Sequence, residues 1–197
     1  MKYFLVILTG LNSLIVFGQN KTEAEQKAFD LQKLKDRVNA ASLVIEGKVI
    51  SQQGIWNQTH TLVFTSNLIQ VYKLFKGKVK SDTIEIIELG GNVDGVVDVN
   101  RDAYYLGPDE EGIFFLKVND LNARTDTSID SYRMQQEEHY GLVRYFQDTI
   151  NPPVLYGNTK FSKPAELYPI ISAYTGARYK VYDINPRDVP PPKKGRK

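Results

Sequence analysis

The sequence predicts an α+β domain that is mainly β: a small antiparallel barrel of five or six strands, with one helix before it and a short helix near its end. Short segments of alternating apolar and β-branched residues recur between positions 42 and 146. One of these segments, residues 61–75, is too long for a flat strand and is expected to coil around a barrel. Apolar residues at helical spacing flank the region on both sides.

The first 18 residues have the order of a secretory signal peptide. Lys2 gives a positive start, residues 4–17 are uncharged and mostly apolar, and the small Gly18 precedes polar residues. The apolar run is shorter than the about 20 residues that a membrane-spanning helix needs, and a retained N-terminal anchor is the alternative. We therefore expect an exported protein of the periplasm, cell surface or medium, with no transmembrane segment after signal removal.

The remaining chain divides into three parts. Residues 19–41 carry apolar side chains every three to four positions, which predicts an amphipathic helix packed on the domain. The barrel domain is expected over residues 42–183, and the Pro- and Lys-rich residues 184–197 are expected to be disordered. Within the domain, strands are expected at 42–50, 61–75, 82–89 and 112–118, and the shorter strand candidates are 132–136, 142–146 and 179–182. Turns or irregular segments are expected at 54–59, 90–111 and 152–163, and a helix at 164–176.

Composition excludes several kinds of chemistry. The chain has no cysteine, so it has no disulfide framework, no thiol nucleophile and no thiolate metal site. Stability must come from a packed core, which 12 Tyr and 9 Phe can supply. The net charge of +2 shows neither the basic excess typical of nucleic-acid binding nor an acidic one.

Residues 41–118 carry a resemblance to a known family, in the segments ASLVIEGKVISQQGIWN, IQVYKLFKG, ELGGNVDG and LGPDEEGIFFLK. These segments resemble the N-terminal domain of exported Bacteroidota proteins, which is similar to the OB-fold barrels of the tissue-inhibitor-of-metalloproteinase (netrin-like) family. Residues 141–145 and 166–176 look like the close of the same unit. The resemblance implies an OB-like barrel without an active site. The eukaryotic inhibitors place an N-terminal cysteine on a zinc ion, and this chain has none.

No catalytic set is recognisable in the sequence. The only histidines, His60 and His139, belong to no HExxH motif, and there is no Gly-x-Ser-x-Gly elbow. The pair Gly90-Gly91 lacks the following Lys and Ser or Thr of a phosphate loop and is expected to form a tight turn or bulge. We therefore expect a protein that is not an enzyme. A hydrolase that uses carboxylates alone is the enzymatic alternative, because it needs no histidine.

Four oxygen-bearing residues have the spacing of a calcium loop. Asp98, Asn100, Asp102 and Asp109 occupy its first, third, fifth and twelfth positions. Two features depart from that pattern: Ala103 stands where the sharp turn needs Gly, and position twelve is Asp instead of the longer Glu. Calcium is the one cofactor that the sequence suggests, and a solvated acidic loop is the alternative.

Aromatic and basic residues near the second strand are the candidate partner-binding residues, namely Trp56, Tyr72, Lys73 and Lys76. Such residues on OB barrels bind oligonucleotides or sugars, but an exported protein rarely meets single-stranded nucleic acid. The leading hypothesis is an exported interaction or accessory module that binds a protein or glycan partner in the envelope or outside the cell. The alternatives are a stand-alone structural remnant of a larger exported protein with a protease or sorting domain, and a calcium-stabilised domain.

Overall fold

The computed structural model describes residues 23–99, 105–121, 123, 128–135, 141–146, 149–150, 154–156 and 159–182. The predicted signal peptide, His139 and the C-terminal tail of residues 184–197 lie outside the described residues. None of the helices in these ranges is long and apolar enough to cross a membrane.

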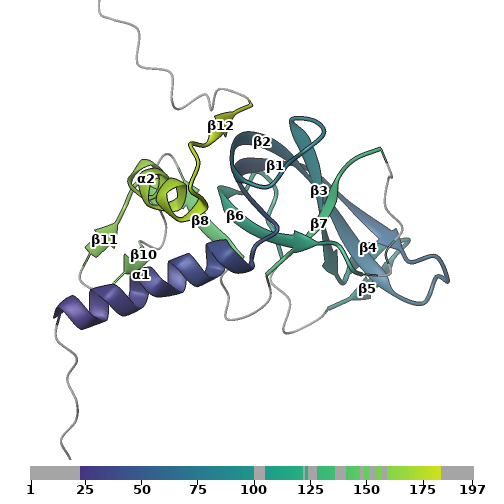
Figure 1. The fold of residues 1–197 in the computed structure, drawn as a ribbon. Coiled ribbons are helices and arrows are strands. Elements are labelled where there is room, and N and C mark those ends of the chain that lie inside the picture. The colour runs from purple at the N-terminus through teal and green to yellow at the C-terminus, as the bar shows by residue number, and fades with distance from the viewer. Residues whose placement is uncertain are drawn as a thin grey trace, which may run out of the picture.

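The described chain is mainly β, with two helices to one side of the sheet (Figure 1). In chain order the elements are α1 (Glu23–Ala40), β1 (Leu43–Trp56), β2 (Val63–Lys76), β3 (Thr83–Leu89), β4 (Gly91–Val93), β5 (Val96–Asp98), β6 (Glu111–Val118), β7 (Ser131–Met134), β8 (Leu142–Phe146), β9 (Thr149–Ile150), β10 (Val154–Tyr156), β11 (Thr159–Phe161), α2 (Pro164–Thr175) and β12 (Lys180–Val181).

The sheet is organised around β1. This strand pairs antiparallel with β2 along most of its length and with β6 through its first half. From β2 the pairings continue to β3, then in parallel to β7, and then to β6. Strands β8 and β9 extend the sheet beyond β6, and β12 pairs with β2.

The mainly β class with two helices is therefore confirmed, whereas the predicted number and direction of the strands were wrong. The main sheet has eight strands and is mixed, because β3 and β7 run parallel. It is also not a clean closed barrel, since β8, β9 and β12 add strands to its margins. The OB-like barrel itself stays a prediction.

Gly47 allows β1 to bend. The register between β1 and β2 shifts at Glu46/Gly47, and a side chain at Gly47 would collide with the carbonyl oxygen of Gln70. Glycine therefore permits a bulge at this position, and a bulge bends the strand that carries it.

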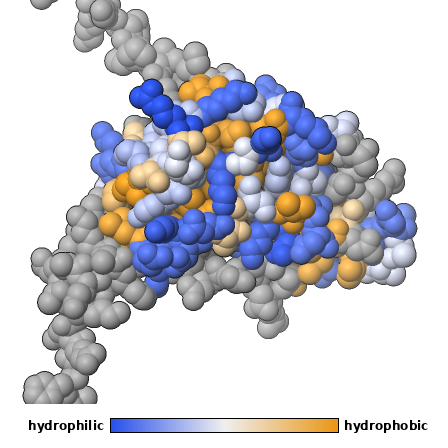
Figure 2. All heavy atoms as spheres, in the orientation of Figure 1, coloured by the Kyte–Doolittle hydropathy of each residue, from blue (hydrophilic) through white to orange (hydrophobic). Residues whose placement is uncertain are grey.

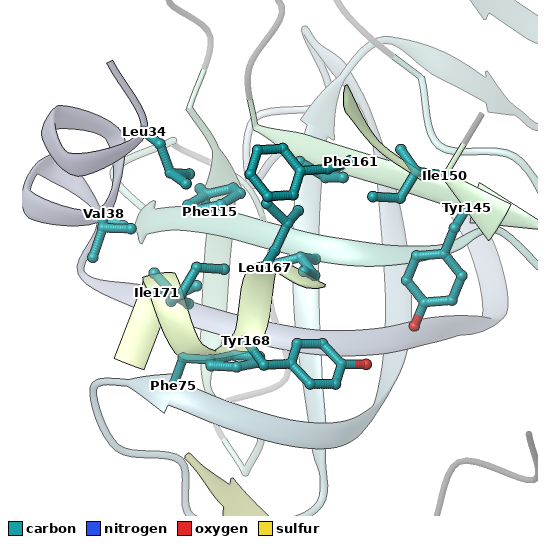
Figure 3. Packing of buried hydrophobic residues seen from close by; sticks show 14 residues of the cluster. Leu34, Val38, Phe75, Phe115, Tyr145, Ile150, Phe161, Leu167, Tyr168 and Ile171 are labelled. Carbon is teal, nitrogen blue, oxygen red and sulfur yellow. The ribbon is translucent and has the colours of Figure 1, made fainter. Parts of the chain in front are cut away.

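Two apolar clusters lie on opposite sides of the sheet. One contains residues of β1, β2, β3 and β6, such as Ile45, Ile84 and Phe114, all inaccessible to solvent. The other lies under the helices, where Val38 of α1 and Leu167 of α2 are buried (Figure 3). Complete burial of such side chains stabilises the fold by about 1.5–3 kcal/mol each, so both helices are integral to the domain.

Three expected turns or loops contain strands instead. The expected turn at 54–59 begins later, because β1 continues through Trp56. The expected irregular segment at 90–111 contains the β4–β5 hairpin, and the expected loop at 152–163 contains the β10–β11 hairpin. Gly54 explains the first hairpin's position: any side chain there would collide with the carbonyl oxygen of Asn92, so glycine lets β4 cross closely over β1.

Candidate functional site

A groove of about 940 Å³ lies beside the second half of β1, the first half of β2 and the end of β4. Its walls come from β1, the following loop, β2, β3, β4 and the residue Ile129 before β7. The lining side chains that carry polar or aromatic groups include Gln53, Trp56, Gln58, His60, Ser66 and Glu85.

Strand register brings the floor of the groove together. Gln53 of β1 is opposite Ser66 of β2, and Leu68 of β2 is opposite Glu85 of β3. Side chains two residues apart on a strand point to the same face, so these four residues share one surface of three adjacent strands.

The loop after β1 is fixed by the side chain of Asn57. Its Oδ1 accepts hydrogen bonds from Thr61 N at 2.7 Å and Leu62 N at 3.1 Å. Its Nδ2 lies 3.0 Å from the hydroxyls of both Thr59 and Thr61. With these four bonds the loop holds His60 in a left-handed conformation at φ 53°.

Trp56 forms one wall of the groove and is held from two directions. Its Nε1 donates to Asp94 Oδ2 at 3.0 Å, which ties the indole to the β4–β5 hairpin. Its ring stacks on His60 with an interplanar angle of 6° and a centroid distance of 5.9 Å. The indole is therefore a rigid, half-buried aromatic surface, and it belongs to the chain's one tryptophan.

Glu85 brings a carboxylate to the groove. The residue is only 5% exposed, and its Oε1 accepts a hydrogen bond from Ser66 Oγ at 2.6 Å. Its other oxygen, Oε2, is buried and has no hydrogen-bond partner among the described residues. A buried acceptor without a donor costs free energy, which a donor in the groove would recover.

A second polar cluster is buried between the sheet and α2. Glu46 Oε1 accepts hydrogen bonds from Tyr145 OH at 2.6 Å and Tyr168 OH at 2.7 Å, and Glu46 Oε2 lies 2.8 Å from Lys73 Nζ. Burial, and then the adjacent Glu46 carboxylate, raise the pKa of Tyr145 far above its usual value, so its hydroxyl remains a donor. These groups contact one another in the interior, which gives them a structural role.

Three of the four predicted partner-binding residues do not reach the groove. Tyr72 and Lys73 are 5% and 4% exposed, so they form no part of an outer binding face. Lys76 Nζ donates to the carbonyl oxygens of Val38 at 2.7 Å and Asn39 at 2.8 Å, at the end of α1. The alternating pattern of β2 identified the strand but not the elements that cover it.

A third buried network contains a carboxylate that sequence reasoning missed. Glu88 Oε2 accepts from Asn67 Nδ2 at 2.8 Å and from Leu106 N at 3.2 Å. Gln52 Nε2 continues the network to Asn67 Oδ1 at 2.6 Å. Burial, and to a smaller extent the nearby Glu110 carboxylate, raise the pKa of Glu88 to about 7 against the opposing effect of the two hydrogen bonds.

The candidate calcium ligands are only partly described. Asn100 and Asp102 lie outside the described residues. Asp109 Oδ1 forms an ion pair with Lys48 Nζ at 2.8 Å, while Asp98 ends β5. The described part of the chain holds no group of three or more His, Asp or Glu side chains arranged for a metal ion. The calcium site stays a prediction.

The chain matches no protein-family model, and a search of curated proteins gives no match either. What the fold and the groove define is therefore a class of structure: a mainly β domain with a mixed sheet, two packed helices and a polar groove with a tryptophan wall. The sequence signal for the groove was the lone Trp56 in the expected polar turn at 54–59. The partners of Trp56 in the groove, on β2, β3 and β4, had no such signal.

Proposed function

We propose that this protein is an exported, non-enzymatic interaction module, built on an OB-like barrel, that binds a protein or glycan partner through the groove beside Trp56. The observation that carries the proposal is the groove itself. Its volume is about 940 Å³. Pockets that bind drug-sized ligands have volumes of about 300–1,000 Å³, so the groove is large enough for a ligand of that size. Its wall is a rigid tryptophan, the residue type most enriched where binding energy is concentrated.

The OB-like part of the proposal is supported by the order of strand pairings. The path β1–β2–β3–β7–β6 returns to β1, because β1 pairs with both β2 and β6. Five strands joined in this way leave β1 no unpaired edge along its first half, which is the advantage of a closed sheet. The extra strands β8, β9 and β12 lie outside this path.

Binding is favoured over catalysis by the lining of the groove. Glu85 is the one carboxylate among the described residues that line it. Hydrolysis by carboxylates alone needs an acid and a base that face the same substrate bond. The export part of the proposal rests on the signal-peptide order of residues 1–18.

The test is affinity capture from native envelope and culture-medium extracts, read by mass spectrometry. Immobilised wild-type protein is compared with Trp56→Ala and with Phe146→Ala, a matched control in which an aromatic side chain 66% exposed on β8 is removed. We expect one partner that the wild type and Phe146→Ala retain and Trp56→Ala loses. Equal capture by all three proteins would contradict the groove, and no enriched partner would favour a structural remnant.

A further inference from the structure

We propose that the groove binds a neutral saccharide, with Trp56 as its apolar wall and the hydrogen-bonded pair of Glu85 and Ser66 as the acceptors for sugar hydroxyls. This inference rests on the proposed function and names the ligand class of the same groove. It follows from the hydrogen-bonding state of the floor, the fixed position of the tryptophan wall and the charge of the lining.

Ser66 and Glu85, on the floor of the groove, offer hydrogen-bond acceptors to a ligand. Ser66 Oγ donates its proton to Glu85 Oε1 at 2.6 Å, so the lone pairs of the same hydroxyl remain as acceptors. Glu85 Oε2 has no hydrogen-bond partner among the described residues. Both groups are therefore matched by a ligand that donates, and sugar hydroxyls are donors that can also accept from the amides nearby.

The wall suits the apolar side of a sugar ring. A pyranose is polar around its edge and carries C–H groups on its faces, so it packs flat on an aromatic ring. Trp56 is held for this role before any ligand arrives, by its bond to Asp94 and its stacking on His60. A preformed surface of this kind binds without the entropy cost of ordering a side chain.

The charge of the lining selects against ionic ligands. No lysine or arginine lines the groove within the described residues, so a phosphate, sulfate or nucleic acid would find no cationic side chain there. The described lining offers a cationic ligand one carboxylate, Glu85, so a cationic probe is included in the experiment below. The exposed amides of Gln53 and Gln58 are neutral and match hydroxyl and acetamido groups.

The experiment uses the fluorescence of Trp56, because the chain's one tryptophan reports on the groove directly. The purified protein is titrated with three neutral probes, maltotetraose, cellotetraose and N-acetylated chitotetraose, and calorimetry measures the affinity independently. Tetralysine and a sulfated heparin fragment are the cationic and anionic probes. We expect saturable binding of at least one neutral probe and none of the charged ones.

Glu85→Gln is the deciding variant. It keeps the size of the side chain but replaces an acceptor by a donor, and we expect binding to weaken about tenfold or more. The matched control is Glu88→Gln, which alters another buried carboxylate of β3 that does not line the groove, and we expect unchanged affinity. If Glu85→Gln has a melting temperature far below that of the wild type, Gln53→Ala is used in its place, because Gln53 is an exposed lining residue. We expect Gln53→Ala to weaken sugar binding about threefold or more.

The saccharide assignment is overturned if no neutral probe binds, if tetralysine or heparin binds instead, or if the groove variants bind sugar as well as the wild type. A result that rejects the saccharide ligand can be told apart from a result that rejects the proposed interaction module. A protein partner that is captured by the wild type and lost with Trp56→Ala would retain the interaction module and reject the sugar.

Discussion

Lys73 Nζ lies 2.8 Å from Glu46 Oε2 in the interior of the protein, where the two side chains are 5% and 1% exposed. The ammonium also lies 4.9 Å from the centre of the Tyr168 ring, on α2. The ion pair thus joins β1 to β2 next to α2. The hydroxyl of Tyr168, labelled in Figure 3, donates a hydrogen bond to the Glu46 carboxylate of this pair. Burying two charges is costly unless each is hydrogen-bonded, which the tyrosines achieve for Glu46.

Lys73→Met is expected to lower the free energy of unfolding by about 3–5 kcal/mol, because it leaves the Glu46 carboxylate buried without its cation. Denaturant titration measures the change. The double variant Lys73→Met with Glu46→Gln removes both charges. Its loss of unfolding free energy is therefore expected to be smaller than the sum of the losses in the two single variants. A loss below about 1 kcal/mol for Lys73→Met would show that the pair contributes little.

Tyr168→Phe is expected to cost about 1.5–3 kcal/mol, the range for a hydrogen bond to a charged group. Its matched control lies on the same helix: Tyr174 OH donates to the neutral carbonyl oxygen of Leu31 at 3.2 Å. Tyr174→Phe should cost about 0.5–1.5 kcal/mol. Thermal and denaturant unfolding of both variants give the comparison, and equal losses would refute a special role for the Glu46 cluster.

Stability is expected to fall with rising pH because of Glu88. Burial raises its pKa from 4.5 to about 7, so the folded state holds the proton more tightly than the unfolded state does. The stabilising contribution is complete below the unfolded pKa and is lost as the pH rises through about 7. The side chain in Glu88→Gln does not titrate. Relative to this variant, the free energy of unfolding of the wild type should fall by up to about 3 kcal/mol between about pH 5 and about pH 8.

Unfolding titrations of the wild type and Glu88→Gln across this pH range test the effect of Glu88, because all other titrating groups are common to both proteins. A difference that does not change with pH would show that Glu88 titrates alike in both states. The groove is expected to keep its sugar affinity in this variant, since Glu88 does not line it.

Lys76→Met is expected to loosen the end of α1. The ammonium of Lys76 supplies donors to two of the last carbonyl groups of that helix, at Val38 and Asn39. Their loss should cost about 1 kcal/mol and raise amide hydrogen exchange in the last turn. Lys78→Met, at an exposed position in the following turn, is the control and should change neither quantity. Unchanged exchange in Lys76→Met would exclude this capping role.

Helices and most strands were predictable because their signals are local. The alternation in residues 82–89 predicted β3, and the glycine after 164–175 predicted the end of α2, where Gly176 has φ 69°. That local alternation gives no signal for what covers the strand. Both Glu85 and Glu88 are buried, because other parts of the chain cover both faces of β3.

By itself, the sequence determined the mainly β class, the positions of the longer strands, the absence of thiol chemistry and the presence of a single tryptophan. The tertiary structure decided which polar residues meet. Glu46 and Tyr168 are 122 positions apart, and Trp56 and Asp94 are 38 apart. The period of a segment reports its local conformation, whereas contacts at these separations depend on how whole elements pack. That difference is why Lys73 was predicted at a surface but lies inside, and why only Trp56 among the predicted residues lies in the groove.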